Sequence, residues 1–243
     1  MMQRLGSMAF TFFMGLSAII IGLIAAPVLL FGQSASRRVI RFWVQTVLAA
    51  LKLFAGVSHR IVGKEYMPKG AAIVAANHQS MWETLILLSI LPKPIMIFKK
   101  ELVRIPVYGW WALPAGHIAV DRKGGAKALR HMRDKAAQRL SEGCQIVVFP
   151  EGTRVAPGDT APFHPGVAGI YTANEAPCIP AAHDSGRFWH FPGIDKTRGE
   201  ITLNFLPPIK PGLDRKSFLK TLKTKIDTAR PDMIHRAKED VEA

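Results

Sequence analysis

The feature that most limits the fold of this chain is a long N-terminal stretch without charge. From Met8 to Phe31 the sequence contains no Lys, Arg, Asp or Glu. At a rise of about 1.5 Å per residue, a helix of this length matches the ~30 Å hydrocarbon core of a bilayer. A cleaved signal peptide is the alternative, but its apolar region usually runs only about 7 to 15 residues. We therefore expect the stretch to be retained as a membrane anchor.

A second helix with a cationic edge is predicted after a break at residues 32–35. Its apolar residues recur at helical spacing, and polar residues line the opposite face. The apolar positions are Ile40, Trp43, Val44, Val47, Leu48, Leu51 and Phe54, and the opposite face carries Arg38, Arg41 and Gln45. An ordinary core helix is the alternative, but the preceding anchor and the Arg37-Arg38-Arg41 cluster favour a position near anionic headgroups.

We expect residues 1–57 to form a membrane-anchoring unit and residues 58–243 to form the main domain. The anchor could span the bilayer or, because Pro27 permits a sharp turn, form a helical hairpin within one leaflet. In either arrangement, positive charge after the anchor places the main domain on the cytoplasmic side of the membrane.

Composition narrows the partners of this chain. The 243 residues include 32 Lys and Arg against 18 Asp and Glu, a net charge of +14, which favours an anionic partner. A nucleic-acid binder is disfavoured, because no basic motif with interleaved aromatic residues is present. Cys144 and Cys178 lie in apolar runs and are expected to be reduced and structural.

The main domain alternates short apolar runs with helical stretches, which predicts an α/β fold with a mixed, mostly parallel sheet. The expected strands are residues 71–76, 94–98, 117–120, 145–149, 178–182 and 201–206, and the expected helices are residues 81–90, 126–140 and 166–174. In such sheets ligands collect where strands end and loops begin. Two polar motifs fall at these places.

The first motif places His78 and Glu83 after a predicted strand. A neutral imidazole can take a proton from a hydroxyl, and a carboxylate on its far nitrogen fixes the tautomer. Such a pair needs no protein nucleophile if the substrate supplies the attacking hydroxyl. However, Ser80-x-x-Glu83 also matches a helix capping box, in which Glu83 only satisfies a backbone donor. A metal site is disfavoured, because no further His or Cys stands nearby at ligand spacing.

The second motif is Glu151-Gly152-Thr153-Arg154, after the strand predicted at residues 145–149. Gly152 permits close backbone approach, and the Arg154 guanidinium can hold a phosphate through two parallel hydrogen bonds. Glu151 could position Arg154 or accept a substrate hydroxyl. A solvated turn is the alternative for the tetrapeptide taken alone.

Together, these residues resemble the glycerolipid acyltransferase family, most closely the bacterial 1-acylglycerol-3-phosphate O-acyltransferases. The resemblance covers roughly residues 58–210 and comprises four blocks in the family's order. The blocks are Asn77-His78 with Glu83; Lys100-Glu101-Leu102 with Pro106, Gly109, Gly116 and Asp121-Arg122; Phe149 to Arg154 with Phe163 and Gly166; and Ile179-Pro180 with His183 to Gly186.

Two positions depart from the family pattern. Glu83 stands where the family usually has aspartate, which keeps the charge but changes the reach by one methylene. His164 and Pro165 stand where the family often has a lysine between Phe163 and Gly166. A phosphate contact from that lysine is therefore not expected here.

The resemblance implies acyl transfer from an acyl thioester, on coenzyme A or acyl carrier protein, to the 2-hydroxyl of lysophosphatidic acid, forming phosphatidic acid. His78 and Glu83 would be catalytic, while Lys100, Glu151, Gly152, Thr153 and Arg154 would bind substrate. It also implies a bacterial inner-membrane enzyme with its catalytic domain on the cytoplasmic face, in contact with anionic membrane lipid. No metal or other cofactor is expected.

Other functions remain open at this point. Within the same class, the acceptor could be glycerol 3-phosphate or another lysolipid, such as a lyso-ornithine lipid. Outside the class, an inactive membrane protein that binds anionic lipid would share the basic composition and the apolar N-terminus.

Overall fold

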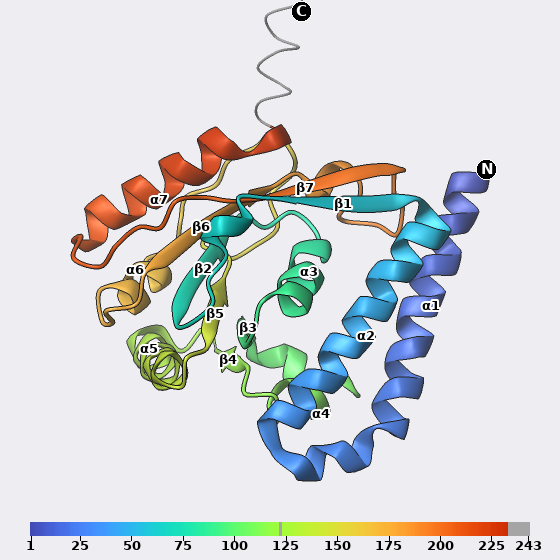
Figure 1. The fold of residues 1–243 in the computed structure, drawn as a ribbon, viewed down its shortest axis with the longest axis horizontal. Coiled ribbons are helices and arrows are strands. Elements are labelled where there is room, and N and C mark those ends of the chain that lie inside the picture. Colours follow the sequence, from blue (N-terminus) through green and yellow to red (C-terminus); the bar gives the residue numbers. More distant parts are fainter. Residues whose placement is uncertain (122, 233–243) are drawn as a thin grey trace, which may run out of the picture.

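The computed structural model describes residues 1–121 and 123–232, and the main domain is built on a seven-stranded sheet (Figure 1). The strand order is β1-β7-β6-β2-β5-β3-β4, and only β6 and β7 pair antiparallel. The strands are β1 (Val57–Val62), β2 (Ala72–Ala76), β3 (Pro94–Lys99), β4 (Ile118–Val120), β5 (Gln145–Val148), β6 (Cys178–His183) and β7 (Gly199–Phe205). The predicted α/β class with a mostly parallel sheet is confirmed.

Helices cover both faces of the sheet, as expected for parallel strands. The helices of the main domain are α3 (Trp82–Ile90), α4 (Tyr108–Ala112), α5 (Gly125–Ser141), α6 (Gly166–Tyr171) and α7 (Arg215–Ala229). Successive residues of β2 point to opposite faces, so Val74 packs with α3 while Ile73 packs with α5, α6 and α7. Cys144 and Cys178 are free and buried in the second of these cores.

The sequence does not predict β1, which lies at one edge of the sheet. Ser58, His59 and Arg60 interrupt its apolar pattern, and most of its residues are partly or fully exposed. An edge strand does not need the continuous apolar run that marks a buried strand. The short helix α4 is also not predicted, because its five residues are too few to show a helical period.

The N-terminal residues form a helical hairpin. Helix α1 (Met2–Ile24) is followed by the 3₁₀ helix η1 (Ala26–Phe31) and helix α2 (Gly32–Ala55), and α1 packs against α2 (Figure 1). The expected break at residues 32–35 is therefore wrong: the chain turns at η1, and residues 32–35 already belong to α2. Pro27 explains the earlier break, because proline at the start of η1 lacks the N–H that would continue α1.

The hairpin shares a hydrophobic core with the main domain. Phe10 of α1 and Val47 and Leu51 of α2 are buried in the same cluster as the side chains of α3. Helix α1 touches the main domain near both ends, since the Ser7 hydroxyl accepts from Lys196 N–H at 3.0 Å and the Gly22 carbonyl accepts from Trp111 Nε1 at 3.3 Å. By length and composition alone α1 could cross a membrane, but here it lies along the domain.

The parallel strands place the two polar motifs at one edge of the sheet. β2 pairs with β5 and β6, and β5 pairs with β3, all in parallel, so their carboxyl ends share that edge. His78 follows β2, Glu151 follows β5 and Lys100 follows β3. The predicted meeting of the motifs at strand ends is confirmed.

The close approach of α1 to α2 generates a prediction about two glycines of α1. A Cβ at Gly6 would lie 2.2 Å from the Phe54 carbonyl oxygen, whereas a Cβ at Gly15 would meet nothing within 4 Å. Gly6→Ala must push the helices apart, and we expect a loss of about 1–3 kcal/mol in unfolding free energy. Gly15→Ala should be neutral or stabilise by up to ~1 kcal/mol through helix propensity. Thermal unfolding of both variants checks this, and equal melting temperatures would contradict the packing described.

Candidate active site

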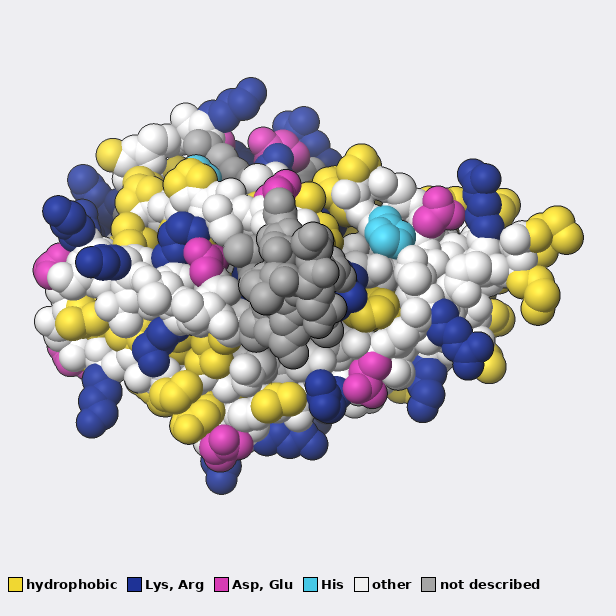
Figure 2. Space-filling model, turned by 90° about the horizontal axis from the view of Figure 1, so that it is seen from above, with side chains coloured by type: hydrophobic (Ala, Val, Ile, Leu, Met, Phe, Trp, Pro, Cys, Tyr) yellow, Lys and Arg dark blue, Asp and Glu magenta, His cyan; other side chains and the backbone are white. Residues whose placement is uncertain are grey.

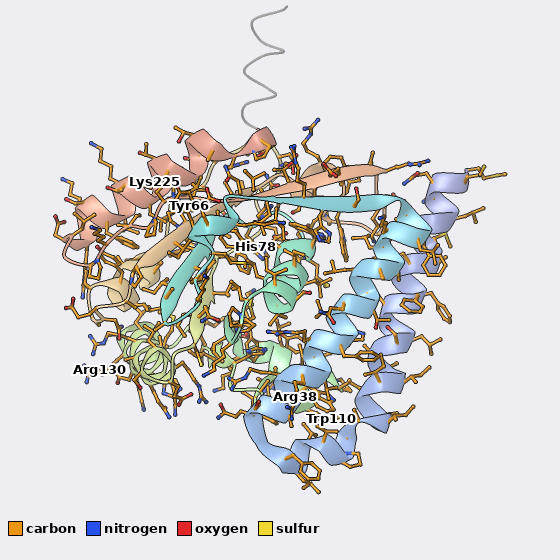
Figure 3. The ribbon with its side chains drawn as sticks, in the orientation of Figure 1. Arg38, Tyr66, His78, Trp110, Arg130 and Lys225 are labelled. Atoms are coloured by element: carbon orange, nitrogen blue, oxygen red, sulfur yellow. The ribbon has the colours of Figure 1, made fainter. Side chains whose placement is uncertain are left out.

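His78 and Glu83 are in direct contact. His78 lies in the loop between β2 and α3 (Figure 3), and Glu83 lies in the first turn of α3. The Nδ1 atom of His78 is 2.7 Å from Oε1 of Glu83. An ionised carboxylate only accepts hydrogen bonds, so Nδ1 carries a proton, and in the neutral form of this ring the lone pair is on Nε2. The His78 side chain is 17% exposed and the Glu83 side chain is fully buried, so the imidazole contacts a buried carboxylate while part of the ring stays accessible.

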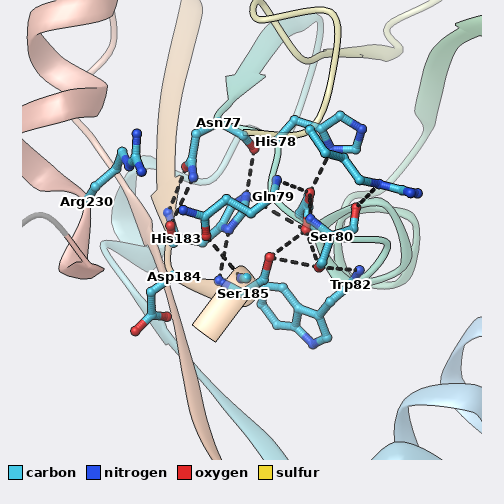
Figure 4. Close-up of polar contacts among 12 residues, drawn as sticks. Asn77, His78, Gln79, Ser80, Trp82, His183, Asp184, Ser185 and Arg230 are labelled. Carbon is cyan, nitrogen blue, oxygen red and sulfur yellow. Dashed lines mark hydrogen bonds and ion pairs between the residues drawn. The ribbon is translucent and has the colours of Figure 1, made fainter. Parts of the chain in front are cut away.

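The Glu83 carboxylate is held by five polar groups (Figure 4). Besides His78, Oε1 accepts from the backbone N–H groups of Gln79 and Ser80, each at 2.8 Å. The hydroxyls of Ser80 and Ser185 both lie 2.8 Å from Oε2. Burial acts to raise the pKa of Glu83, but His183 and the hydrogen bonds outweigh it and hold the pKa well below its usual range. The carboxylate is therefore ionised at neutral pH.

Glu83 also bonds to the backbone just before α3, which is one part of the capping alternative, although the N-cap residue Met81 makes no side-chain cap bond. Glu83 accepts from the Ser80 N–H, and the Ser80 hydroxyl accepts from the Trp82 N–H at 3.0 Å. Because a carboxylate offers about four acceptor sites, this backbone contact and orientation of His78 do not compete. The added methylene of glutamate lets Oε2 reach Ser185, which follows β6.

The Glu151 carboxyl and the Phe149 ring fix the other sides of His78. The His78 ring stacks on Phe149 with centroids 4.3 Å apart, and its backbone N–H donates to Oε2 of Glu151 at 2.5 Å. Glu151 is 3% exposed, and burial raises its pKa to about 8 despite the opposing effects of the His78 N–H and Arg230. In the structure, Glu151 thus supports the backbone of His78.

Arg154 contacts the same loop that carries His78. Its Nε donates to the Ser80 carbonyl at 3.0 Å, and its guanidinium lies 4.2 Å from the centroid of Phe191. Gly152 has φ +67°, and a Cβ there would lie 2.7 Å from the ring of His164. The left-handed conformation and the nearby imidazole both require glycine at this position. Thr153 is exposed on the same turn.

Lys100 does not join this group of residues. It is exposed at the start of the 3₁₀ helix η3 (Lys100–Arg104), and within residues 1–121 and 123–232 no hydrogen bond or ion pair links it to His78 or Arg154. Its place beyond the end of β3 still puts it at the carboxyl edge of the sheet. Asp121 is followed by Arg122, which lies outside the described residues.

Several supporting contacts were not predicted from the sequence. Asn77 clamps β2 to β6: its side chain donates to the His183 carbonyl at 3.0 Å and accepts from the His183 N–H at 2.9 Å. The His183 ring is fully buried, 2.7 Å from the Asn77 carbonyl and 4.0 Å from Glu83. The resemblance drew attention to His183 and Ser185 as a block, but only the pairing of β2 with β6 brings them to Glu83.

A buried ion pair near the C-terminus also holds the site. Arg230 and Asp232 are 1% and 5% exposed and lie 2.6 Å apart. Asp232 accepts from the Gln79 side chain and from Gly158 N–H, both at 2.9 Å, and Arg230 donates to the Asp159 carbonyl at 2.7 Å. The pair therefore joins the residue after His78 to the loop that follows Arg154. No sequence motif marked it.

No metal centre accompanies the pair: among the described residues, no three His, Cys, Asp or Glu side chains are grouped so that they could hold a metal ion. The contact of His78 with Glu83 supports proton transfer by an oriented imidazole, beside a guanidinium suited to an anion.

The raised pKa of Glu151 predicts a pH-dependent stability. Its folded pKa of about 8 exceeds its ordinary value of 4.5, so the folded protein retains a proton that the unfolded chain releases. This contribution is complete below pH 4.5 and is lost as the pH rises toward 8. Glu151→Gln stays neutral and can still accept from the His78 N–H. The melting temperature of the variant relative to the native protein should therefore rise between pH 5 and pH 8 and then level off, whereas a difference that does not vary with pH would refute the assignment.

Known proteins that are similar to this chain are acyltransferases. The model of the acyltransferase family matches residues 58–184. A 1-acyl-sn-glycerol-3-phosphate acyltransferase from Pseudomonas aeruginosa is 28% identical over 82% of this chain and 78% of its own length. The human alpha form is 28% identical over 68% of this chain, which spans 60% of that protein.

A solved structure shares the fold of most of the chain. The crystal structure of the 1-acyl-sn-glycerophosphate acyltransferase from Thermotoga maritima aligns with a TM-score of 0.74 over 94% of this chain and 97% of that one, at 22% identity. The family match covers more than half of the chain and includes both polar motifs. The protein belongs to the acyltransferase family.

Proposed function

We propose that this protein transfers an acyl group from an acyl thioester to the 2-hydroxyl of 1-acyl-glycerol 3-phosphate, forming phosphatidic acid for phospholipid synthesis. The observation that carries the proposal is the 2.7 Å contact between His78 Nδ1 and Glu83 Oε1, which leaves Nε2 able to accept a proton. The names of the relatives support this choice of acceptor.

In the proposed reaction His78 is the general base and Glu83 orients it. Nε2 takes the proton of the acceptor hydroxyl as its oxygen bonds to the thioester carbonyl carbon, and the ionised Glu83 stabilises the imidazolium that results. When the tetrahedral intermediate collapses, the C–S bond breaks and the imidazolium returns the proton to the leaving thiolate. General-base catalysis contributes roughly 10²- to 10⁴-fold, so positioning of the two substrates must supply much of the remainder.

Substrate binding is assigned to the Glu151–Arg154 turn and Lys100. Arg154 holds the acceptor phosphate, and Gly152 and Thr153 give the backbone of the turn close access to it. Glu151 accepts a hydrogen bond from the His78 backbone N–H and so supports the site indirectly. Lys100 is assigned to substrate binding as a further cation, besides Arg154, at the carboxyl edge of the sheet. The donor thioester is on coenzyme A or acyl carrier protein, and assays with each carrier decide between them.

The hairpin is proposed to hold residues 58–243 on the cytoplasmic face of a bacterial inner membrane. Leu30 and Phe31 at its tip are 88% and 76% exposed, and Trp110 on α4 is exposed at the same end of the molecule (Figure 3). Because α1 contacts the main domain near both of its ends, a hairpin inserted into one leaflet fits better than a spanning helix.

Charge contributes less to this attachment than the sequence suggests. Arg41 donates to the carbonyls of Leu91 and Pro92, and Arg37 donates to that of Ala115, so both turn toward the protein. Figure 2 shows the face of the molecule opposite the hairpin tip, and there the Lys and Arg side chains are spread around the edge instead of forming one patch. Apolar insertion, aided by Arg38 and anionic lipid, therefore carries the proposal.

The proposed roles of His78 and Glu83 predict the activity of three variants. His78→Ala removes the base and should lower kcat by at least ~10²-fold without loss of folding. Glu83→Gln keeps a capping side chain but loses the charge, so it should lose most activity. Glu83→Asp should retain some activity but cannot reach all five partners. Turnover measured with lysophosphatidic acid and each thioester checks all three variants, and near-native rates in Glu83→Gln would mean that Glu83 only caps the helix.

The exposed tip predicts where attachment is lost. Replacing both Leu30 and Phe31 with Glu puts two charges where the bilayer core is expected, and binding to vesicles should fall by more than tenfold. Leu213→Glu, at an exposed apolar residue just before α7, is the matched control and should bind normally. Co-sedimentation in low and high salt measures both. If the tip variant binds like the control, or if the native protein is released by salt alone, the apolar hairpin is not the anchor.

A further inference from the structure

A basic cavity opens beside Arg154 on the side of the site away from β3. It has a volume of about 360 Å³, and its wall includes Gln79, Arg154, Arg187, His190 and Phe191. The described residues that line it include no Asp or Glu. A cavity with two guanidinium groups, an imidazole and no lining carboxylate suits a compact anion.

Arg154 turns toward this cavity. Its guanidinium stacks on Phe191, which belongs to the loop between β6 and β7. Its Nε is engaged by the Ser80 carbonyl, and in residues 1–121 and 123–232 no hydrogen bond occupies its terminal nitrogens. The strand order places β6 on one side of β2 and places β5 and β3 on the other. Arg154 and Arg187, which follows β6, line the same cavity, and Lys100, which follows β3, is not among the described residues that line it.

The backbone around Arg187 is held firmly. A Cβ at Gly186 would lie 2.8 Å from Pro157 and 3.0 Å from the Gln79 Cβ, so the loop presses against both of these residues. Gly186 N–H donates to the Gln79 side chain at 3.1 Å, and Arg187 N–H donates to the Asp184 carbonyl at 3.1 Å. The Arg187 guanidinium makes a loose ion pair with Asp184 at 3.8 Å and lies 5.7 Å from the centroid of the Phe188 ring, and its side chain is 37% exposed. The backbone of Arg187 is therefore held in place, and its guanidinium is partly exposed and able to bind a ligand.

The cavity lies next to the catalytic pair. Gln79 follows His78 directly, and Arg154 bonds to the carbonyl of Ser80, one residue further along the chain. In a glycerol 3-phosphate ester, only two carbons and one oxygen separate the reacting 2-hydroxyl from the phosphorus. In a phosphopantetheine thioester, by contrast, the long pantetheine arm separates the thioester from the nearest phosphate. A phosphate beside His78 therefore suits the acceptor and not the donor.

We propose that Arg187, with His190 at the rim, forms the second half of the acceptor-phosphate site opposite Arg154 and so determines the preference for a phosphorylated acceptor. The proposal rests on the proposed acylation of a lysophospholipid and adds the residues that recognise its headgroup. His190 points its Nε2 at the Thr197 hydroxyl, 2.7 Å away, which holds the ring in place.

The test is the kinetics of Arg187→Gln and Arg187→Lys with lysophosphatidic acid as acceptor. Loss of one charge-assisted contact should lower kcat/KM for this acceptor about tenfold or more in Arg187→Gln, with the donor KM unchanged. Arg187→Lys keeps the positive charge but loses the planar guanidinium, so its kcat/KM should lie between those of the native protein and Arg187→Gln. Arg130→Gln, an exposed arginine on α5 (Figure 3), is the matched charge control and should behave like the native protein.

A double-mutant cycle separates a shared ligand from two independent effects. If Arg154 and Arg187 hold one phosphate, the combined loss in the Arg154→Gln, Arg187→Gln protein should differ from the sum of the single losses. Melting temperatures of all variants check that the Asp184 loop stays folded. Native kcat/KM in Arg187→Gln would overturn the proposal, as would additive effects in the cycle or a rise confined to the donor KM.

These outcomes remain distinct from failure of the proposed function. If Arg187→Gln is normal while His78→Ala abolishes acylation of lysophosphatidic acid, the function stands and the phosphate site is elsewhere. If the native protein acylates no lysophosphatidic acid with either thioester, the function itself fails. A native protein that prefers an acceptor without phosphate also overturns the role given to Arg187.

Discussion

The site depends on one buried charge, the carboxylate of Glu83. An isolated ionised carboxylate in an apolar interior is very costly, so its position is set by the groups that compensate it. Those groups come from two distant segments: residues 78–80 after β2, and Ser185 after β6. Orientation of His78 is thus tied to correct pairing of β2 with β6. A single requirement, solvation of this charge, organises both the proposed base and the loops around it.

Residues from several segments of the chain surround and support His78. Phe149 and Glu151 follow β5 and hold the ring and the backbone of His78. Asp232 links Gln79 to the loop after Arg154, and the loop after β6 carries Ser185 and Arg187. The ends of β2, β5 and β6 each contribute contacts, as expected for an open α/β sheet, where ligands collect at the carboxyl ends of the strands. Rigidity of this kind is what a reaction that relies on positioning requires.

The hairpin gives the molecule its second organising constraint. Because α2 fills the same core as α3, the proposed membrane unit cannot leave without exposing apolar surface of the main domain. The apolar tip and the sheet edge that carries the proposed catalytic pair are therefore held in a fixed position relative to each other. For an acceptor that resides in a bilayer, this relation sets how the acceptor's headgroup reaches His78.

Local patterns in the sequence were enough to determine the α/β class, the buried strands, the apolar N-terminal helix and the His78–Glu83 and Glu151–Arg154 motifs. These depend on periodicity, on continuous apolar runs and on short spacing, all of which are local. Tertiary structure alone decided that the hairpin packs on the main domain, that edge strand β1 pairs with β7, and that Glu83 bonds both to the backbone before α3 and to His78. It also decided that His183, Ser185 and the Arg230–Asp232 pair meet residues 77–83, because these contacts join residues 102 to 153 positions apart in the chain and leave no local signal.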